Sequence, residues 1–319
     1  MSIGVVDESG RTFGFVRRRG TVSEPVTPET PFRLASISKT ITATAVLKLV
    51  DAGRVSLDDR PVESILSRRG LECRTPGISG IRVRDLLSHT SGFASGREWF
   101  FDEIVGDTTE LVRRFCERDL RSTPGSRYEY SNFNFLLLGW LIEDVTGSPY
   151  DVAVDSVLLR PAGLSTFRFH ETSDVARWEP DYHVDPGSNY MELLGAAGAW
   201  SASSIETATF IAGLAASESG RGYLSSSTFR EMSNAAPRSA AGSSWGYGLG
   251  LRLFSGGVWG HTGSIESIKA IAIHLPDGAS IAVLVNGDRP EVSDELVELV
   301  VTVWWATHYV GPIPVIPPM

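Results

Sequence analysis

Ser36 and Lys39 are the residues of this chain whose types and spacing first indicate chemistry. They stand three apart in PFRLASISKTITATAVLKLVDAG (31–53), so a helix there places them on one face. A serine hydroxyl is a weak nucleophile until a base takes its proton, and a desolvated lysine can be that base, whereas an arginine cannot. The chain has only three lysines (Lys39, Lys48 and Lys269) among its 29 basic residues. A GC-rich genome explains this bias equally well, so the pair alone is a weak signal.

Two further groups of residues strengthen the pattern. Tyr130 and Asn132 supply a phenol and an amide just before the apolar stretch FNFLLLGWLI. Their ordinary interpretations are a core-edge aromatic and a helix N-cap. His261, Thr262 and Gly263 lie in WGHTGS, on a predicted strand. A glycine inside a strand often marks the close approach of another backbone or of a ligand, although His261 could also be a buried structural histidine.

The elements that must position these residues follow from turn signals and periodicity. A hairpin is predicted over 2–18, and the length of the run over 36–52, which ends at Gly53, favours a helix over a strand. The other predicted helices are 131–146, 203–217 and 291–308, and the other predicted strands are 247–254, 258–261, 270–275 and 280–285. Strands at both ends of the chain around a helical middle predict an α+β fold with one antiparallel sheet flanked by helices. We expect residues 1–60 and 203–319 to form the sheet domain and residues 61–202 a mostly helical insertion, together one unit.

Composition limits the classes of function. The chain has 319 residues, 42% of them hydrophobic and 21% charged, so it can bury a large core. A net charge of −9 with only short, scattered basic clusters argues against nucleic acid as a partner. No apolar run reaches the ~20 residues that span a bilayer. No leader peptide is visible, so we expect a cytoplasmic protein, with a secreted form left open if the true start lies upstream.

Cys73 and Cys116 complete the inventory of reactive side chains. They lie far apart, without CxxC or histidine spacing. We therefore expect reduced structural cysteines rather than a disulfide, and we predict neither a cofactor nor a metal.

Taken together, the three motifs resemble those of the class C β-lactamase and penicillin-recognising serine hydrolase family. Ser-x-x-Lys, Tyr-x-Asn about ninety residues on, and His-Thr-Gly near the C-terminus stand in the family's order, and the resemblance covers nearly the whole chain. Linking segments that match the family's habits are LLSHTSG (86–92), PG (124–125), LLG (137–139), GAAG (195–198) and GYGLG (246–250). The resemblance implies a β-lactamase/transpeptidase-like fold with a cleft between the sheet and the helical insertion.

The resemblance also implies a role for each motif residue. Ser36 would be the nucleophile that forms an acyl-enzyme. Lys39 would be its base, or would keep Tyr130 acidic so that the phenolate is the base, and both alternatives stay open. Asn132 would orient Lys39 and a substrate amide. The implied oxyanion hole is the backbone N–H pair of Ser36 and Ser264, and the implied substrate-binding residues are Thr262 and Gly263.

Two departures from the family's pattern affect these expectations. His261 stands where β-lactamases and carboxypeptidases of the family usually carry the lysine that attracts a substrate carboxylate. Because histidine is only partly charged near pH 7, this weakens the case for such a substrate, although His261 stays among the expected catalytic residues. Relatives also usually carry a helix before their first strand. Either that helix is absent here, leaving apolar surface that a second copy of the chain would cover, or the true start lies upstream.

The expected function is that of a serine hydrolase that acts on a carboxylic ester or a small amide through acyl-Ser36. Ester hydrolysis is favoured because the carboxylate-binding lysine is missing. The alternatives are a penicillin-binding protein or D-amino-acid peptidase, a weak β-lactamase, a transacylase that uses an amine or alcohol in place of water, and a non-enzymatic relic. Intact Ser36, Lys39, Tyr130 and Asn132 argue against a relic.

Overall fold

A seven-stranded antiparallel sheet organises the chain. In a computed structural model, residues 1–17, 26–171, 190–234, 246–265, 268–286 and 300 are described. The strand order is β2-β1-β10-β9-β8-β7-β6, and every neighbouring pair is antiparallel. The strands are β1 (Ser2–Val6), β2 (Thr12–Val16), β6 (Gly246–Tyr247), β7 (Arg252–Leu253), β8 (Trp259–Ile265), β9 (Ile268–His274) and β10 (Ser280–Asn286). A small second sheet joins β3 (Phe32–Arg33), β5 (Trp200–Ala202) and β4 (Arg168–Phe169).

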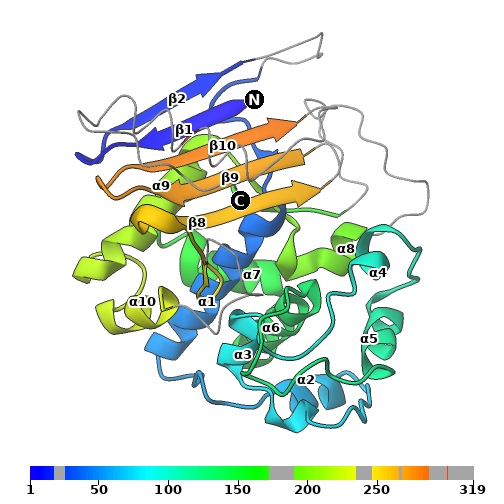
Figure 1. Cartoon of the computed structure of the whole chain (residues 1–319). Helices are drawn as coiled ribbons and strands as arrows, with labels where there is room; N and C mark the ends of the chain where they lie inside the picture. Colours follow the sequence, from blue (N-terminus) through cyan, green and yellow to red (C-terminus); the bar gives the residue numbers. More distant parts are fainter. Residues whose placement is uncertain (18–25, 172–189, 235–245, 266–267, 287–299, 301–319) are drawn as a thin grey trace.

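Most of the helices lie on one side of this sheet, below it in Figure 1. They are α1 (Ser38–Asp51), α2 (Val62–Arg68), α3 (Val83–Leu87), α4 (Arg97–Phe101), α5 (Thr108–Cys116), α6 (Asn132–Thr146), α7 (Tyr150–Val154), α8 (Tyr190–Leu194), α9 (Ser204–Ala215) and α10 (Ser226–Met232). Short turns of other helical types are η1 (Ala35–Ile37), η2 (Ile78–Gly80), η3 (Asp155–Leu159), η4 (Gly195–Ala197), η5 (Ala216–Ser219) and η6 (Ser255–Gly257).

The sheet is built from both ends of the chain, as the sequence predicts. β1 pairs with β10, so residues 2–6 lie beside residues 280–286 (Figure 1). α9 lies against β1, β10 and β9. At Gly4 an added Cβ would come within 2.1 Å of the carbonyl oxygen of Ser204, so only glycine lets helix and strand approach this closely. The α+β fold class is thus confirmed.

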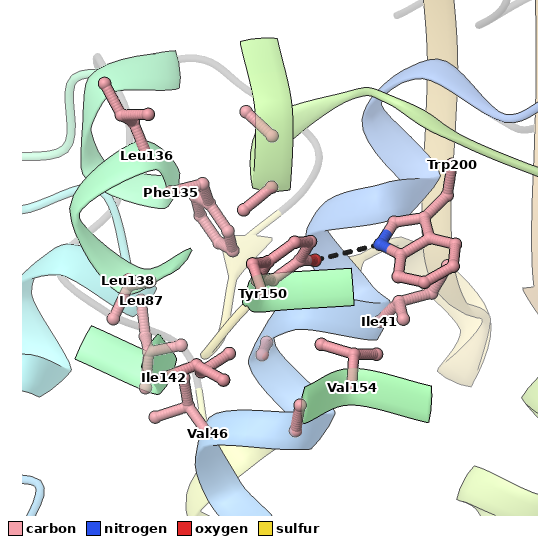
Figure 2. Packing of buried hydrophobic residues seen from close by; sticks show 14 of the residues in the cluster. Ile41, Val46, Leu87, Phe135, Leu136, Leu138, Ile142, Tyr150, Val154 and Trp200 are labelled. Carbon is pink, nitrogen blue, oxygen red and sulfur yellow. Dashed lines mark hydrogen bonds between the residues drawn. The ribbon is translucent and has the colours of Figure 1, made fainter. Parts of the chain in front are cut away.

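Helix α1 is almost completely buried, which explains its composition. Its apolar side chains Ile41 and Val46 pack beside side chains of α6 and α7, among them Phe135, Ile142 and Val154 (Figure 2). Its alternating threonines are buried too, and each hydroxyl donates a hydrogen bond to a carbonyl oxygen. Small and β-branched residues therefore form a helix here because tertiary packing outweighs their strand propensity.

The predicted strand over 247–254 is wrong in one respect. Tyr247 and Arg252 pair with each other in two short strands, with a sharp reversal between them. Gly250 has a φ of +79°, and its carbonyl oxygen accepts a hydrogen bond from Thr40 on α1. The alternation of apolar residues indicated one strand, but docking of this glycine turn on α1 divides it.

The expectation of reduced cysteines is also wrong, because Cys73 and Cys116 form a disulfide bond. Their Cα atoms are 5.0 Å apart. The hydroxyl of Thr75 donates to the carbonyl oxygen of Cys116, so the chain after α2 lies directly beside the end of α5. A contact between residues 43 positions apart leaves no local signal in the sequence.

Some expectations are not tested by this structure. The predicted helix over 291–308 falls, except for Val300, outside the described residues. The domain boundaries near residues 60 and 202 stay a prediction. In the described part of the chain, no helix has both the length and the apolar character needed to cross a membrane.

Candidate active site

Ser36 lies in the 3-10 turn η1, which runs directly into α1. The residue before it, Ala35, has a φ of +47°, a left-handed conformation that is costly for a residue with a Cβ. A Cβ on Gly263 of β8 would come within 2.3 Å of the carbonyl oxygen of Leu34. Strand β8 therefore approaches the backbone just before Ser36, and this contact brings the third motif beside the first.

Two side chains converge on the hydroxyl oxygen of Ser36. Lys39 Nζ donates to it at 3.1 Å, and the phenol of Tyr130 donates to it at 2.9 Å. Lys39 Nζ also lies 4.9 Å from the centre of the Tyr130 ring. The sequence placed these three residues in one site, and the structure brings all three into contact.

The protonation equilibria of Lys39 and Tyr130 are shifted in opposite directions. Burial, followed by the positive charge of Arg252, holds the pKa of Lys39 well below its usual value of 10.5. Burial raises the pKa of Tyr130 to about 12, although the hydrogen bond to Ser36 and the charge of Arg252 act against this rise. Both shifts favour the neutral form of the group concerned.

Lys39 is held in place from the side of η4. Its Nζ donates to the carbonyl oxygen of Ala197 at 2.8 Å. The neighbouring carbonyl of Ala196 accepts from Thr42 of α1. The hydroxyl of Tyr150 lies 2.6 Å from that of Thr42 and accepts from the indole N–H of Trp200 at 2.9 Å, the dashed line in Figure 2. This buried network holds the carbonyl of Ala196, which directly precedes the residue whose carbonyl Lys39 contacts.

Asn132 is placed differently from what the sequence indicated. It is the first residue of α6, it is 7% exposed, and its Oδ1 has no hydrogen-bond partner among the described residues. Lys39 uses its hydrogen bonds on Ser36 and Ala197 instead. A buried acceptor without a partner is costly, so Asn132 Oδ1 is ready to accept an N–H group from outside the chain.

The third motif presents its residues on two sides of β8. His261 is completely buried, and its Nδ1 donates to the carbonyl oxygen of Thr262 at 2.6 Å. Its Nε2 therefore accepts from the hydroxyl of Tyr247 at 2.9 Å. Burial, then the charges of Arg252 and Lys39, lower the pKa of His261 well below its usual value. His261 is thus a neutral, internally bonded residue, whereas Ser264 is exposed.

Arg252 is a residue that the motifs did not indicate. It lies half-buried on β7, with Gly260 as its register partner on β8. Its charge acts on six titratable groups of the region: Lys39, His89, Tyr128, Tyr130, Tyr247 and His261. No signal in the sequence separates Arg252 from the other arginines, because its importance comes from its position in the sheet.

Metal binding finds no support in this geometry. Among the described residues, no three histidine, cysteine, aspartate or glutamate side chains are grouped so that they could hold an ion. The hydroxyl of Ser36 contacts an amine and a phenol, two groups that can exchange a proton with it.

Comparison with known proteins agrees with this class of site. A sequence model of the Beta-lactamase family matches residues 4–301, so the chain belongs to that family. Esterase EstB of Burkholderia gladioli is 31% identical over 172 residues, which cover 50% of this chain and 43% of the esterase. The crystal structure of a D-stereospecific amidohydrolase from Streptomyces sp. superimposes with a TM-score of 0.73 at 29% identity, covering 93% of this chain and 92% of the amidohydrolase.

A second solved structure is similar in fold. The D-amino acid amidase of Ochrobactrum anthropi SV3 has a TM-score of 0.75 at 24% identity, covering 95% of this chain and 94% of the amidase. The chain spans less than half the length of the first curated relatives that it matches.

Proposed function

We propose that this protein is a serine hydrolase that cleaves carboxylic esters or small amides through an acyl-Ser36 intermediate. The observation that carries the proposal is the convergence of Lys39 and Tyr130 on the Ser36 hydroxyl, in a place where burial favours the neutral form of both. A neutral amine 3.1 Å from a hydroxyl oxygen is within reach of its proton.

The reaction follows from these contacts. Ser36 Oγ attacks the substrate carbonyl carbon while its proton passes to Lys39 Nζ. The backbone N–H groups of Ser36 and Ser264 stabilise the oxyanion, each worth on the order of 3 kcal/mol of the barrier. When the carbon–oxygen or carbon–nitrogen bond breaks, the proton from Lys39 passes to the leaving alcohol or amine, with Tyr130 as the relay. Water then attacks acyl-Ser36 by the same route, releasing the acid and restoring the serine hydroxyl.

The assignment of the base favours Lys39 over Tyr130. Serving as the base requires the unprotonated form, and the pKa of Lys39 is lowered toward neutrality whereas that of Tyr130 is raised to about 12. Near pH 7 a phenolate at Tyr130 would therefore be rare, while its phenol can donate a proton.

A short-chain p-nitrophenyl ester tests the proposal directly. We expect turnover by the wild type, and loss of turnover to the background level in Ser36→Ala. The matched control is Ser67→Ala, at an exposed serine of α2 with no proposed role, which should stay within about threefold of wild type. Equal turnover by wild type and Ser36→Ala would overturn the proposal. No turnover by the wild type would contradict the esterase form of it.

A second candidate function is hydrolysis of a small amide or peptide that carries a free carboxylate. Arg252 favours it, because a permanent cation beside the site can attract the carboxylate that a lysine at position 261 would otherwise bind. The amidohydrolase similarity supports amide substrates as well. The test compares kcat/KM for a dipeptide and for its C-terminal amide. A preference for the free acid that disappears in Arg252→Gln supports this candidate, and no preference contradicts it.

A further inference from the structure

His89 is a buried residue with an unusual backbone and no part in the reaction described above. It follows α3 and is 0% exposed. Its φ is +56°, the left-handed region that residues other than glycine rarely adopt, asparagine being the most tolerant of them. A strained, fully buried residue next to an active site needs an explanation in terms of what it touches.

His89 holds the chain on both sides of Tyr130. Its carbonyl oxygen accepts from the backbone N–H of Glu129 at 2.8 Å, and its Nδ1 accepts from the backbone N–H of Ser131 at 3.2 Å. The His89 ring lies against the Tyr130 ring, with centroids 4.3 Å apart and planes at 36°. Three contacts from one residue thus fix the backbone before, the backbone after, and the ring of the tyrosine.

The stretch around Tyr130 is held by contacts outside regular secondary structure, among them the hydrogen bond from Ser95 N to Glu129 Oε1 at 3.3 Å. Residues 127–131 belong to no helix or strand, so no regular ladder sets the position of the phenol. The hydrogen bond from Gly125 N to Thr90 O anchors the stretch further upstream, on the residue after His89. His89 and its neighbour Thr90 therefore hold the backbone that carries the Tyr130 hydroxyl, 2.9 Å from Ser36 Oγ, and Tyr247 adds a ring contact from another chain segment.

The hydrogen bonds fix the tautomer of His89. Ser91 Oγ donates to Asn134 Oδ1 at 2.6 Å, so the amide nitrogen of Asn134 faces His89 and donates to Nδ1 at 3.1 Å. With two N–H donors pointing at it, Nδ1 carries no proton, and the ring proton is on Nε2. Nδ1 is therefore a constant acceptor.

We propose that His89 is a positioning residue for Tyr130, holding its phenol on the Ser36 oxygen through the Nδ1 acceptor. The inference rests on the proposed function, since it needs Tyr130 to take part in acyl transfer. It assigns His89 no contact with substrate and no proton transfer.

Two substitutions separate the acceptor from the backbone conformation. Asparagine and glycine both tolerate the left-handed backbone, but only asparagine carries an acceptor, Oδ1, near the place of Nδ1. We expect His89→Gly to lower kcat by about 10–100-fold with little change in KM, because small displacements of a reacting group are costly. We expect His89→Asn to stay within about fivefold of wild type. Equal losses in the two variants would overturn the proposal.

A double-mutant cycle with Tyr130→Phe shows whether His89 acts through the tyrosine. If it does, His89→Gly lowers kcat in the wild-type background but changes it less than about threefold once the phenol is gone. A purely structural role predicts that the two losses multiply, and this result would overturn the inference while leaving the proposed function intact. Retained turnover in Ser36→Ala would instead remove the proposed function. Should His89→Gly not fold, as judged by thermal unfolding, His89→Ala, which also lacks the acceptor, takes its place in the same cycle.

Discussion

Two serine–lysine pairs lie in the described part of the chain, and only one has the environment of a catalytic pair. Lys39 Nζ is 3.1 Å from Ser36 Oγ, and Lys269 Nζ is 2.5 Å from Ser264 Oγ. The first pair is three residues apart at the start of α1, and the second faces across the β8–β9 ladder. By distance alone the second pair is the better candidate.

Burial and charge make the difference. Lys39 is 0% exposed, and no ion pair among the described residues includes it, so burial and the charge of Arg252 hold its pKa well below the usual value. Lys269 is half-buried beside an exposed serine, and its pKa is lowered by burial and by Arg97 without the marked shift of Lys39. A lysine becomes a base where water is excluded, and proximity to a hydroxyl is not sufficient.

Exchanging each lysine for arginine tests most directly whether Lys39, and not Lys269, is the base. Arginine keeps the positive charge but cannot give up its proton. We expect Lys39→Arg to lower kcat/KM by about 10²–10⁴-fold, the usual contribution of a general base. Lys269→Arg should change it by about twofold at most, as most surface substitutions do. Both are measured with the p-nitrophenyl ester.

Lys39→Met is the second test at the buried position, because arginine is larger than the space it must fill. Methionine has nearly the length of lysine and no base, so the same loss is expected with the fold preserved. Activity in Lys39→Met near the wild-type level would show that the base lies elsewhere.

Ser36, Lys39 and Tyr130 were predicted to share one site because the order and spacing of their motifs resemble those of a known family. Ser36 and Lys39 are linked by helical spacing, and Tyr130 stands at the start of an apolar helix whose end at Gly147 is also readable. The sheet from both chain ends followed from the distribution of strand patterns. The helices and strands depend on periodicity and turn chemistry, which one sequence contains, whereas the meeting of Tyr130 with Ser36, 94 positions away, was implied by the resemblance.

What could not be predicted depends on contacts between distant segments. Arg252 reaches the site through the pairing of β7 with β8, and Cys73 meets Cys116 because the chain after α2 lies beside the end of α5. His261 was expected among the catalytic residues. That role stays a prediction, and the sequence did not indicate that the side chain is completely buried with its Nε2 bonded to Tyr247. The motifs indicate which residues gather at the site, but the direction in which each side chain points depends on tertiary packing.

The next prediction concerns stability, where the two lysines should again differ. Burying an amine costs free energy, so we expect Lys39→Met to raise the free energy of unfolding at pH 7 by about 1–4 kcal/mol at the expense of activity. Lys269→Met should stay within about 0.5 kcal/mol of wild type. Urea unfolding of the three proteins gives both values.

The stability gained in Lys39→Met should depend on pH in a definite direction. The pKa of Lys39 is lower in the folded than in the unfolded chain, where it is near 10.5, so between the two values the unfolded state binds more protons. The free energy of unfolding of the wild type therefore rises as pH increases toward 10.5, because the cost of burying Lys39 becomes smaller. The advantage of Lys39→Met should shrink between pH 7 and pH 9. An advantage that grows with pH would contradict the lowered pKa.

The smallest expected effect concerns the arginine whose charge lowers the pKa of each lysine. Arg252 lowers the pKa of Lys39, and Arg97 lowers that of Lys269. Because the base must be unprotonated, kcat/KM should rise with pH through the pKa of Lys39. In Arg252→Gln the pKa of Lys39 rises, because the charge of Arg252 is one of the two causes that lower it. The acid limb of the plot of kcat/KM against pH should therefore move to higher pH. Arg252→Lys, which keeps the charge, and Arg97→Gln should leave the limb in place. A limb that moves in Arg97→Gln and not in Arg252→Gln would mean that Lys269 supplies the base, and the roles of the two pairs would be reversed.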